Sequence, residues 1–73
     1  MKLVNSLRQE DVDWLEANRL VFENHRRSMS KEQVAELFVI LSWLTAKNQK
    51  PTGCGRCIAS ARDIVWATYK KQD

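Results

Sequence analysis

The strongest hydrophobic pattern in the chain lies between residues 31 and 46. Val34, Leu37 and Leu41 recur every three or four residues, which is the spacing of one face of an α-helix. Residues 30–33 form a capping box before this pattern, because a serine and a glutamine three residues apart can satisfy each other's free backbone N–H groups. Further apolar positions broaden the face: Phe38, Leu44, Ala35, Val39, Ile40, Trp43 and Ala46. We therefore predict a central helix over 31–46 that is almost wholly enclosed.

A second helix is predicted over residues 7–26. Ser6 and Gln9 match a capping box, and the acidic residues that follow suit the positive end of a helix dipole. Its apolar stripe has approximately helical spacing and consists of Leu7, Val12, Trp14, Leu15, Val21 and Phe22, with His25 near the same face.

A third helix is predicted over residues 55–71. The polar segment 47–53 precedes it and holds the only proline and one of the two glycines, so the central helix must end there. Lys70 and Lys71 suit the negative end of the third helix. Apolar and small residues return at helical spacing at Cys57, Ile58, Ala61, Ile64, Val65, Thr68 and Tyr69.

These elements predict an all-α fold, either a three-helix bundle or a helical hairpin plus a third helix, in one domain over residues 1–73. A chain of 73 residues removes only about 60% of its unfolded surface from water on folding. A partner subunit or a bound metal would therefore add useful stability. So small a core leaves little room for a deep cavity, and we expect no small-molecule substrate.

The start of the chain does not resemble a secretory signal, because charged residues appear within the first eleven positions and no apolar h-region is present. The longest strongly apolar stretch covers residues 37–44, far short of the ~20 residues needed to span a bilayer. We expect a cytoplasmic protein without a membrane span.

Positive charge is concentrated in the last third of the chain. Residues 1–46 carry six Lys or Arg against seven Asp or Glu, whereas residues 47–73 carry six against two. Together with two aromatic rings that could stack on bases, these cations form a candidate surface for nucleic acid or an acidic partner: Lys47, Lys50, Arg56, Arg62, Trp66, Tyr69, Lys70 and Lys71. In the alternative interpretation the cations are solvated and Trp66 caps the core.

The only two cysteines, Cys54 and Cys57, form a C-x-x-C at the predicted start of helix 55–71. The helix dipole and Arg56 would lower the thiol pKa, which favours redox chemistry, although the strand-to-helix context of thioredoxin-type sites is missing. The two thiolates could instead supply half of a tetrahedral zinc site. His25 and a carboxylate could complete that site, or a second chain could add its own two cysteines in a zinc-linked dimer.

A third interpretation gives the cysteines a packing role, and we rank it first. Cys54 and Cys57 are i,i+3 neighbours on one helix face, and free cysteine is among the most buried residue types. Their side chains would pack the start of the third helix against the central one.

No catalytic constellation is evident. The sequence holds no glycine-rich phosphate loop, no His-Glu-x-x-His and no paired carboxylates in an apolar context. The single histidine, His25, precedes two arginines and suits a helix end. A monomer of this size does not readily bury the side chains of three tryptophans. We expect a non-enzymatic helical module that binds a protein partner or self-associates.

The stretch Lys50-Pro51-Thr52-Gly53-Cys54-Gly55-Arg56-Cys57 resembles a pattern in small helical proteins encoded by tailed bacteriophages and related mobile elements. In those proteins a helical segment is followed by a polar loop and then by a C-x-x-C that opens a basic helix. The resemblance covers roughly the C-terminal half of the chain. It implies a phage context, in the virion or the host cytoplasm, with a virion-associated or host-interaction role, and it transfers no site residue.

Overall fold

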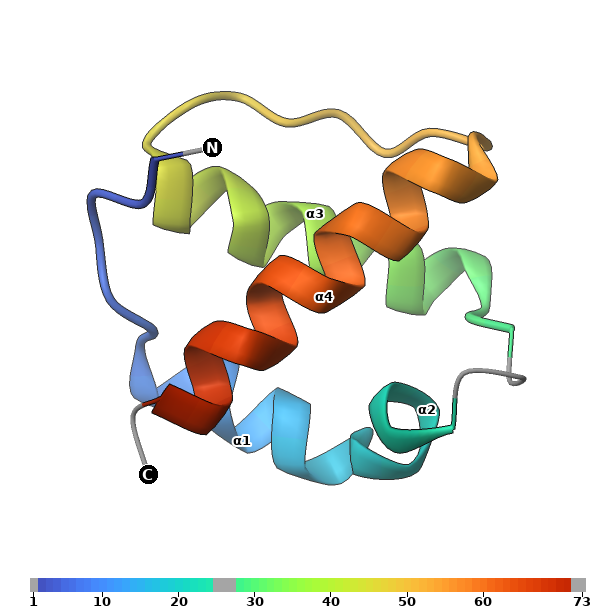
Figure 1. The fold of residues 1–73 in the computed structure, drawn as a ribbon, viewed down its shortest axis with the longest axis horizontal. Helices are drawn as coiled ribbons and strands as arrows, with labels where there is room; N and C mark the ends of the chain where they lie inside the picture. The colour runs from blue at the N-terminus through green and yellow to red at the C-terminus, as the bar shows by residue number, and fades with distance from the viewer. Residues whose placement is uncertain (1, 25–27, 72–73) are drawn as a thin grey trace.

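The computed structural model describes residues 2–24 and 28–71 and contains four helices within them. These are α1 (Gln9–Ala17), α2 (Arg19–Glu23), α3 (Lys31–Thr45) and α4 (Gly55–Lys71). Over the described ranges there is no strand, which confirms the predicted all-α class. In Figure 1, α4 crosses over α3 and its C-terminal end reaches α1.

The predicted capping box opens α3. The Gln33 backbone N–H donates to Ser30 Oγ at 3.2 Å, and the Ser30 N–H donates to Gln33 Oε1 at 2.8 Å. These two bonds satisfy donors that have no partner within the helix. The central helix therefore begins where its sequence predicts, at Lys31.

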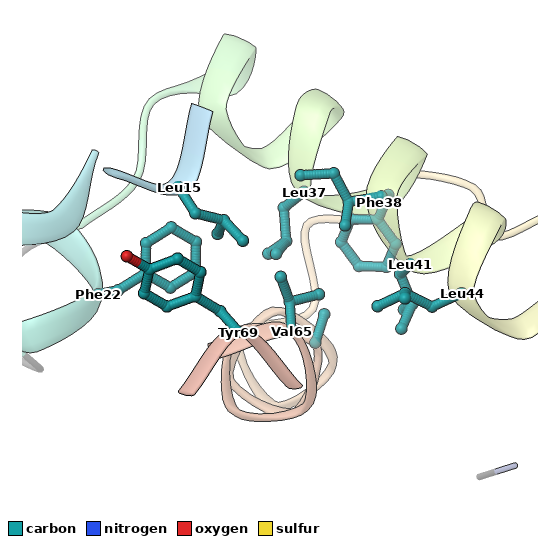
Figure 2. Packing of buried hydrophobic residues seen from close by; sticks show 10 residues of the cluster. Leu15, Phe22, Leu37, Phe38, Leu41, Leu44, Val65 and Tyr69 are labelled. Atoms are coloured by element: carbon teal, nitrogen blue, oxygen red, sulfur yellow. The ribbon is translucent and has the colours of Figure 1, made fainter. Parts of the chain in front are cut away.

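The core lies where α4 crosses the other helices. Figure 2 shows side chains from all four helices pointing toward one another. The residues that form this cluster are Leu15, Phe22, Leu37, Phe38, Ile40, Leu41, Leu44, Ala61, Val65 and Tyr69. Five of these ten residues come from α3, so α3 is the central element, as predicted.

The prediction that α3 is almost wholly enclosed is wrong on one side. Val39 remains 50% exposed and Trp43 remains 39% exposed, and Ala35 and Ala46 are also exposed. The other helices cover only the face that carries Leu37 and its neighbours. A chain of this length forms few layers, so the opposite face of its central helix stays in water.

The predicted helix 7–26 is shorter and interrupted. It begins at Gln9 rather than Leu7, because the carboxylate of Asp11 accepts the backbone N–H of Arg8 at 3.1 Å and so replaces the expected Ser6 cap. Asn18 then separates α1 from α2, and its side-chain amide donates to the Trp14 carbonyl at 2.8 Å. Asparagine favours such local side-chain bonds over a continuous helix. Residues 25 and 26 lie outside the described part of the chain.

The N-terminal segment closes the C-terminal end of α3. The backbone N–H groups of Val4 and Asn5 donate to the Leu44 carbonyl at 2.8 and 3.1 Å, and the Asn5 side chain donates to the Trp43 carbonyl at 2.7 Å. Helix C-termini leave four carbonyls without intrahelical partners. Segments 40 residues apart in sequence are thereby joined at one end of the fold (Figure 1).

Ala46 ends α3 in the left-handed region, with φ at 55°. An L-residue pays roughly 1–2 kcal/mol for this conformation and glycine does not. We expect Ala46→Gly to raise the free energy of unfolding by about 0.5–1 kcal/mol. Ala67→Gly, at an exposed position inside α4, is the matched control and should lower it by a similar amount. Urea denaturation measures both, and a destabilising Ala46→Gly would contradict the account.

Candidate functional site

Both cysteines are exposed, so the predicted packing role is wrong. The buried stripe of α4 runs through Tyr69, Val65 and Ala61, and one further step of four residues reaches Cys57. At that position the space between α4 and α3 is open rather than filled. The two cysteines lie in solvent, although Ile58 in the first turn of α4 packs against the core.

The open space beside Cys57 is a groove of about 520 Å³ between α3, the loop that follows it and α4. Gln49 holds the loop in place, because its N–H donates to Ser42 Oγ at 2.9 Å. The wall of the groove is mostly apolar and includes Phe38, Leu41, Gln49, Arg56, Cys57 and Ile64. The groove could receive an extended segment or a small apolar group next to a thiol.

Cys54 acts as the cap of α4. Its carbonyl accepts the Ile58 N–H at 3.0 Å, and its sulfur accepts the Cys57 N–H at 3.3 Å. A side-chain hydrogen bond with Cys57, followed by the backbone N–H groups of Cys57 and Arg56, lowers the pKa of Cys54. The same side-chain bond is the main reason that the pKa of Cys57 is raised. The Cys54 sulfur, which accepts a backbone N–H at the start of α4, is therefore the better placed of the two to carry a negative charge.

Within the described residues, no carboxylate joins the two cysteines to form the expected metal site. His25 lies outside the residues that the structure describes, and within those residues no group of three or more His, Cys, Asp or Glu side chains comes together. Cys54 and Cys57 are thus a pair of thiols with no third protein ligand among the described residues. Tetrahedral zinc needs four ligands, so such an ion would need ligands from elsewhere.

Three members of the candidate nucleic-acid surface have structural contacts. The guanidinium of Arg62 donates to the carbonyls of Val21 and Asn24 at the end of α2. Tyr69 is buried, and the ring of Trp66 stacks between its neighbours, with centroids 5.2 Å from Phe22 and 4.9 Å from Tyr69. Tyr69 therefore serves the core, whereas the half-buried ring of Trp66 also lines a small pocket together with Arg62 and Lys70.

The remaining cations of that surface are spread out. Lys47, Lys50, Arg56, Lys70 and Lys71 are all exposed, but the first two lie in the loop after α3, Arg56 lies at the start of α4, and the last pair lies at its end. The ammonium of Lys70 also lies 6.0 Å from the Trp66 ring centroid. The arrangement does not form one basic groove lined by free aromatic rings.

Sequence reasoning missed the exposed side of α3. Ala35, Val39 and Trp43 follow one another at intervals of four residues and all are exposed, so they form one row along the helix. Leu3 and Val4 adjoin the Trp43 end of the row and are 37% and 56% exposed. We call these five residues the outer face of α3. The four-residue spacing is visible in the sequence, but Ala35, Val39 and Trp43 were assigned to the core.

Two contacts hold the ring of Trp43 in place within the outer face. Its indole N–H donates to the Ser6 carbonyl at 2.7 Å, and the guanidinium of Arg8 lies 4.7 Å from its ring centroid. Arg8 is itself fixed by Asp11, to which it donates two side-chain hydrogen bonds at 3.0 and 3.1 Å. A large aromatic ring that is already ordered loses little entropy when a partner covers it.

Within the described residues, none of the helices combines the length and the apolar character needed to cross a membrane. Comparisons with models of known protein families, with curated proteins and with solved structures found no match to this chain.

Proposed function

We propose that this protein is a non-enzymatic helical assembly module that forms a homodimer through the outer face of α3. The observation that carries the proposal is the exposed row Ala35, Val39 and Trp43 on the central helix. Apolar side chains that are scattered singly on a surface need no explanation, but a contiguous row points to an interaction site.

The row is suited to a second copy of itself. A two-fold interface places the same patch of each subunit opposite the other. With the axis at Val39 and the two α3 helices antiparallel, Ala35 of each copy would lie opposite Trp43 of the other. The smallest side chain of the row would then receive the largest, and Val39 would meet its own equivalent. Rows spaced four residues apart are the usual contact between packed helices.

Charged residues flank the row. Lys31 and Glu32 lie at the start of α3 and Lys47 lies beyond its end, and all three are exposed. In the antiparallel pair the start of α3 in one copy would lie beside the end of α3 in the other, so these charges would form the polar rim of the interface.

Val39→Glu is the direct test, because it would place two carboxylates together at the proposed axis. We expect sedimentation velocity of the wild-type protein to show a concentration-dependent dimer, and the variant to dissociate at least ~10-fold more readily. Leu20→Glu is the matched control, since Leu20 is 66% exposed on α2, away from the row, and should leave the dimer unchanged. Circular dichroism checks that both variants stay helical.

Two outcomes would contradict the proposal: a wild-type protein that stays monomeric up to millimolar concentration, or equal dissociation by both variants. The antiparallel register has its own test. Val39→Cys, in a chain that also carries Cys54→Ser and Cys57→Ser, should form a disulfide-linked dimer on mild oxidation. If the protein stays dimeric but this disulfide does not form, the two-fold axis does not pass through Val39.

A further inference from the structure

The C-x-x-C has no part in the proposed dimer. It lies at the start of α4, whereas the outer face lies on α3 and is widened by the N-terminal segment (Figure 1). Both thiols are exposed. Cys54 immediately precedes the 17-residue helix α4, Cys57 lies in its first turn, and Cys57 borders a groove. Neither the core nor the assembly requires these residues.

We propose that Cys54 and Cys57 form a dithiol–disulfide couple that exchanges with a disulfide bond of another molecule, with Cys54 as the attacking thiol and Cys57 as the resolving one. This role needs no residue beyond the pair itself. A zinc site, in contrast, needs ligands that the described part of one chain does not bring together.

The geometry assigns different roles to the two cysteines. The sulfur of Cys54 lies just before the first turn of α4 and accepts the Cys57 N–H at 3.3 Å. Backbone N–H groups and the positive end of a helix stabilise a thiolate at that position. Cys57 lies inside the first turn, and the pKa of its thiol is raised, chiefly by the hydrogen bond with Cys54. Cys54 is therefore the cysteine that ionises first and attacks.

The chemistry consists of two balanced exchanges. The Cys54 thiolate attacks one sulfur of the substrate disulfide, forms a mixed disulfide with it and expels the other sulfur as a thiolate. The Cys57 thiol then loses its proton to solvent, and its thiolate attacks the sulfur of Cys54. The substrate's second thiolate leaves and the Cys54–Cys57 disulfide forms. The substrate disulfide gains two electrons, and the cysteine pair loses the same two.

The groove beside Cys57 suits a disulfide carried on a peptide. It has a volume of about 520 Å³, with apolar side chains from α3 and α4 and polar groups from Gln49 and Arg56 at its border. A peptide segment that enters it would hold its disulfide next to the exposed first turn of α4. Phe38 and Leu41 form the floor on α3, so the site would favour segments with apolar residues beside the cysteine.

Single cysteine variants treated with oxidised glutathione test the proposal. Cys57→Ser retains the attacking thiol and a hydroxyl donor, so it should accumulate a stable mixed disulfide with one glutathione. Cys54→Ser should react at least ~10-fold more slowly at pH 7, because its remaining thiol lacks the backbone N–H and the position before the helix start that stabilise a thiolate at Cys54. The wild-type protein should end as an intramolecular disulfide without attached glutathione. Mass spectrometry of acid-quenched samples distinguishes all three products.

Three results would overturn the proposal. The two single variants could react at equal rates, or the wild-type protein could end with glutathione on both cysteines, which would show two independent thiols. Alternatively, the purified protein could carry zinc at half an equivalent per chain, with thiols that react only after chelation. That result would replace the redox couple with a four-thiolate site between two chains. Repeating the exchange with Val39→Glu separates this chemistry from dimer formation.

Discussion

Leu37→Ala is expected to lower the free energy of unfolding by about 2–5 kcal/mol, the largest effect of any single substitution considered for this protein. Leu37 is fully buried on the inner face of α3 and lies in the cluster that joins all four helices (Figure 2). The truncation removes buried methyl groups and leaves a cavity that the surrounding helices can fill only in part. A domain of this size has little stability in reserve, so a measurable fraction of the variant should be unfolded without denaturant.

Leu20→Ala provides the matched control for this prediction. It makes the same chemical change at a leucine that is 66% exposed, so the free energy of unfolding should change by no more than about 0.5 kcal/mol. Urea denaturation monitored by circular dichroism measures both variants. Equal losses at the two positions would mean that the helices do not pack as described.

Asp11→Ala is expected to lower the free energy of unfolding by about 2–3 kcal/mol. Asp11 is only 1% exposed although it is charged, and its carboxylate accepts the N–H that caps α1 and two hydrogen bonds from the Arg8 side chain. Alanine removes the cap and leaves the Arg8 guanidinium without its buried partner. The ring of Trp43 then loses the fixed cation that lies against it, so the packing of this tryptophan should loosen as well.

Asp13→Ala is the control for the buried carboxylate. Asp13 lies on the same helix but is exposed, and it accepts a single hydrogen bond from Gln9 at 3.0 Å. Its loss should cost about 0.5 kcal/mol or less. Thermal unfolding of the two variants, with tryptophan fluorescence as a second signal, compares them. If Asp11→Ala is no more harmful than Asp13→Ala, the buried pair with Arg8 does not anchor α1.

Local signals in the sequence were sufficient for α3 and α4. The Ser30 and Gln33 box, the apolar period and the polar break at 47–53 are all properties of neighbouring residues, and the observed bounds Lys31–Thr45 and Gly55–Lys71 follow from them. The first helix was less accurate because Ser6 also fits a capping box. A tertiary contact assigns the Ser6 carbonyl to Trp43, and a competing local bond between Arg8 and Asp11 gives the capping role to Asp11.

The candidate sites depended on contacts that no local pattern contains. Exposure of Cys54 and Cys57 follows from how α4 packs on α3, and the contacts of Arg62 follow from where α2 ends. The spacing of residues along a helix indicates which of them share a face, but it does not indicate how many faces of that helix are covered by neighbouring helices. That ambiguity is why Val39 and Trp43 were assigned to the interior.

The sequence by itself determined that the chain is helical, where its central and last helices lie, and that two cysteines lie at the start of the last one. Only the tertiary structure decided that one side of α3 stays in water and that the cysteines face solvent. The physical reason is that helix formation depends on bonds between residues four apart, whereas burial depends on which distant segments pack together and on how much surface so short a chain can cover.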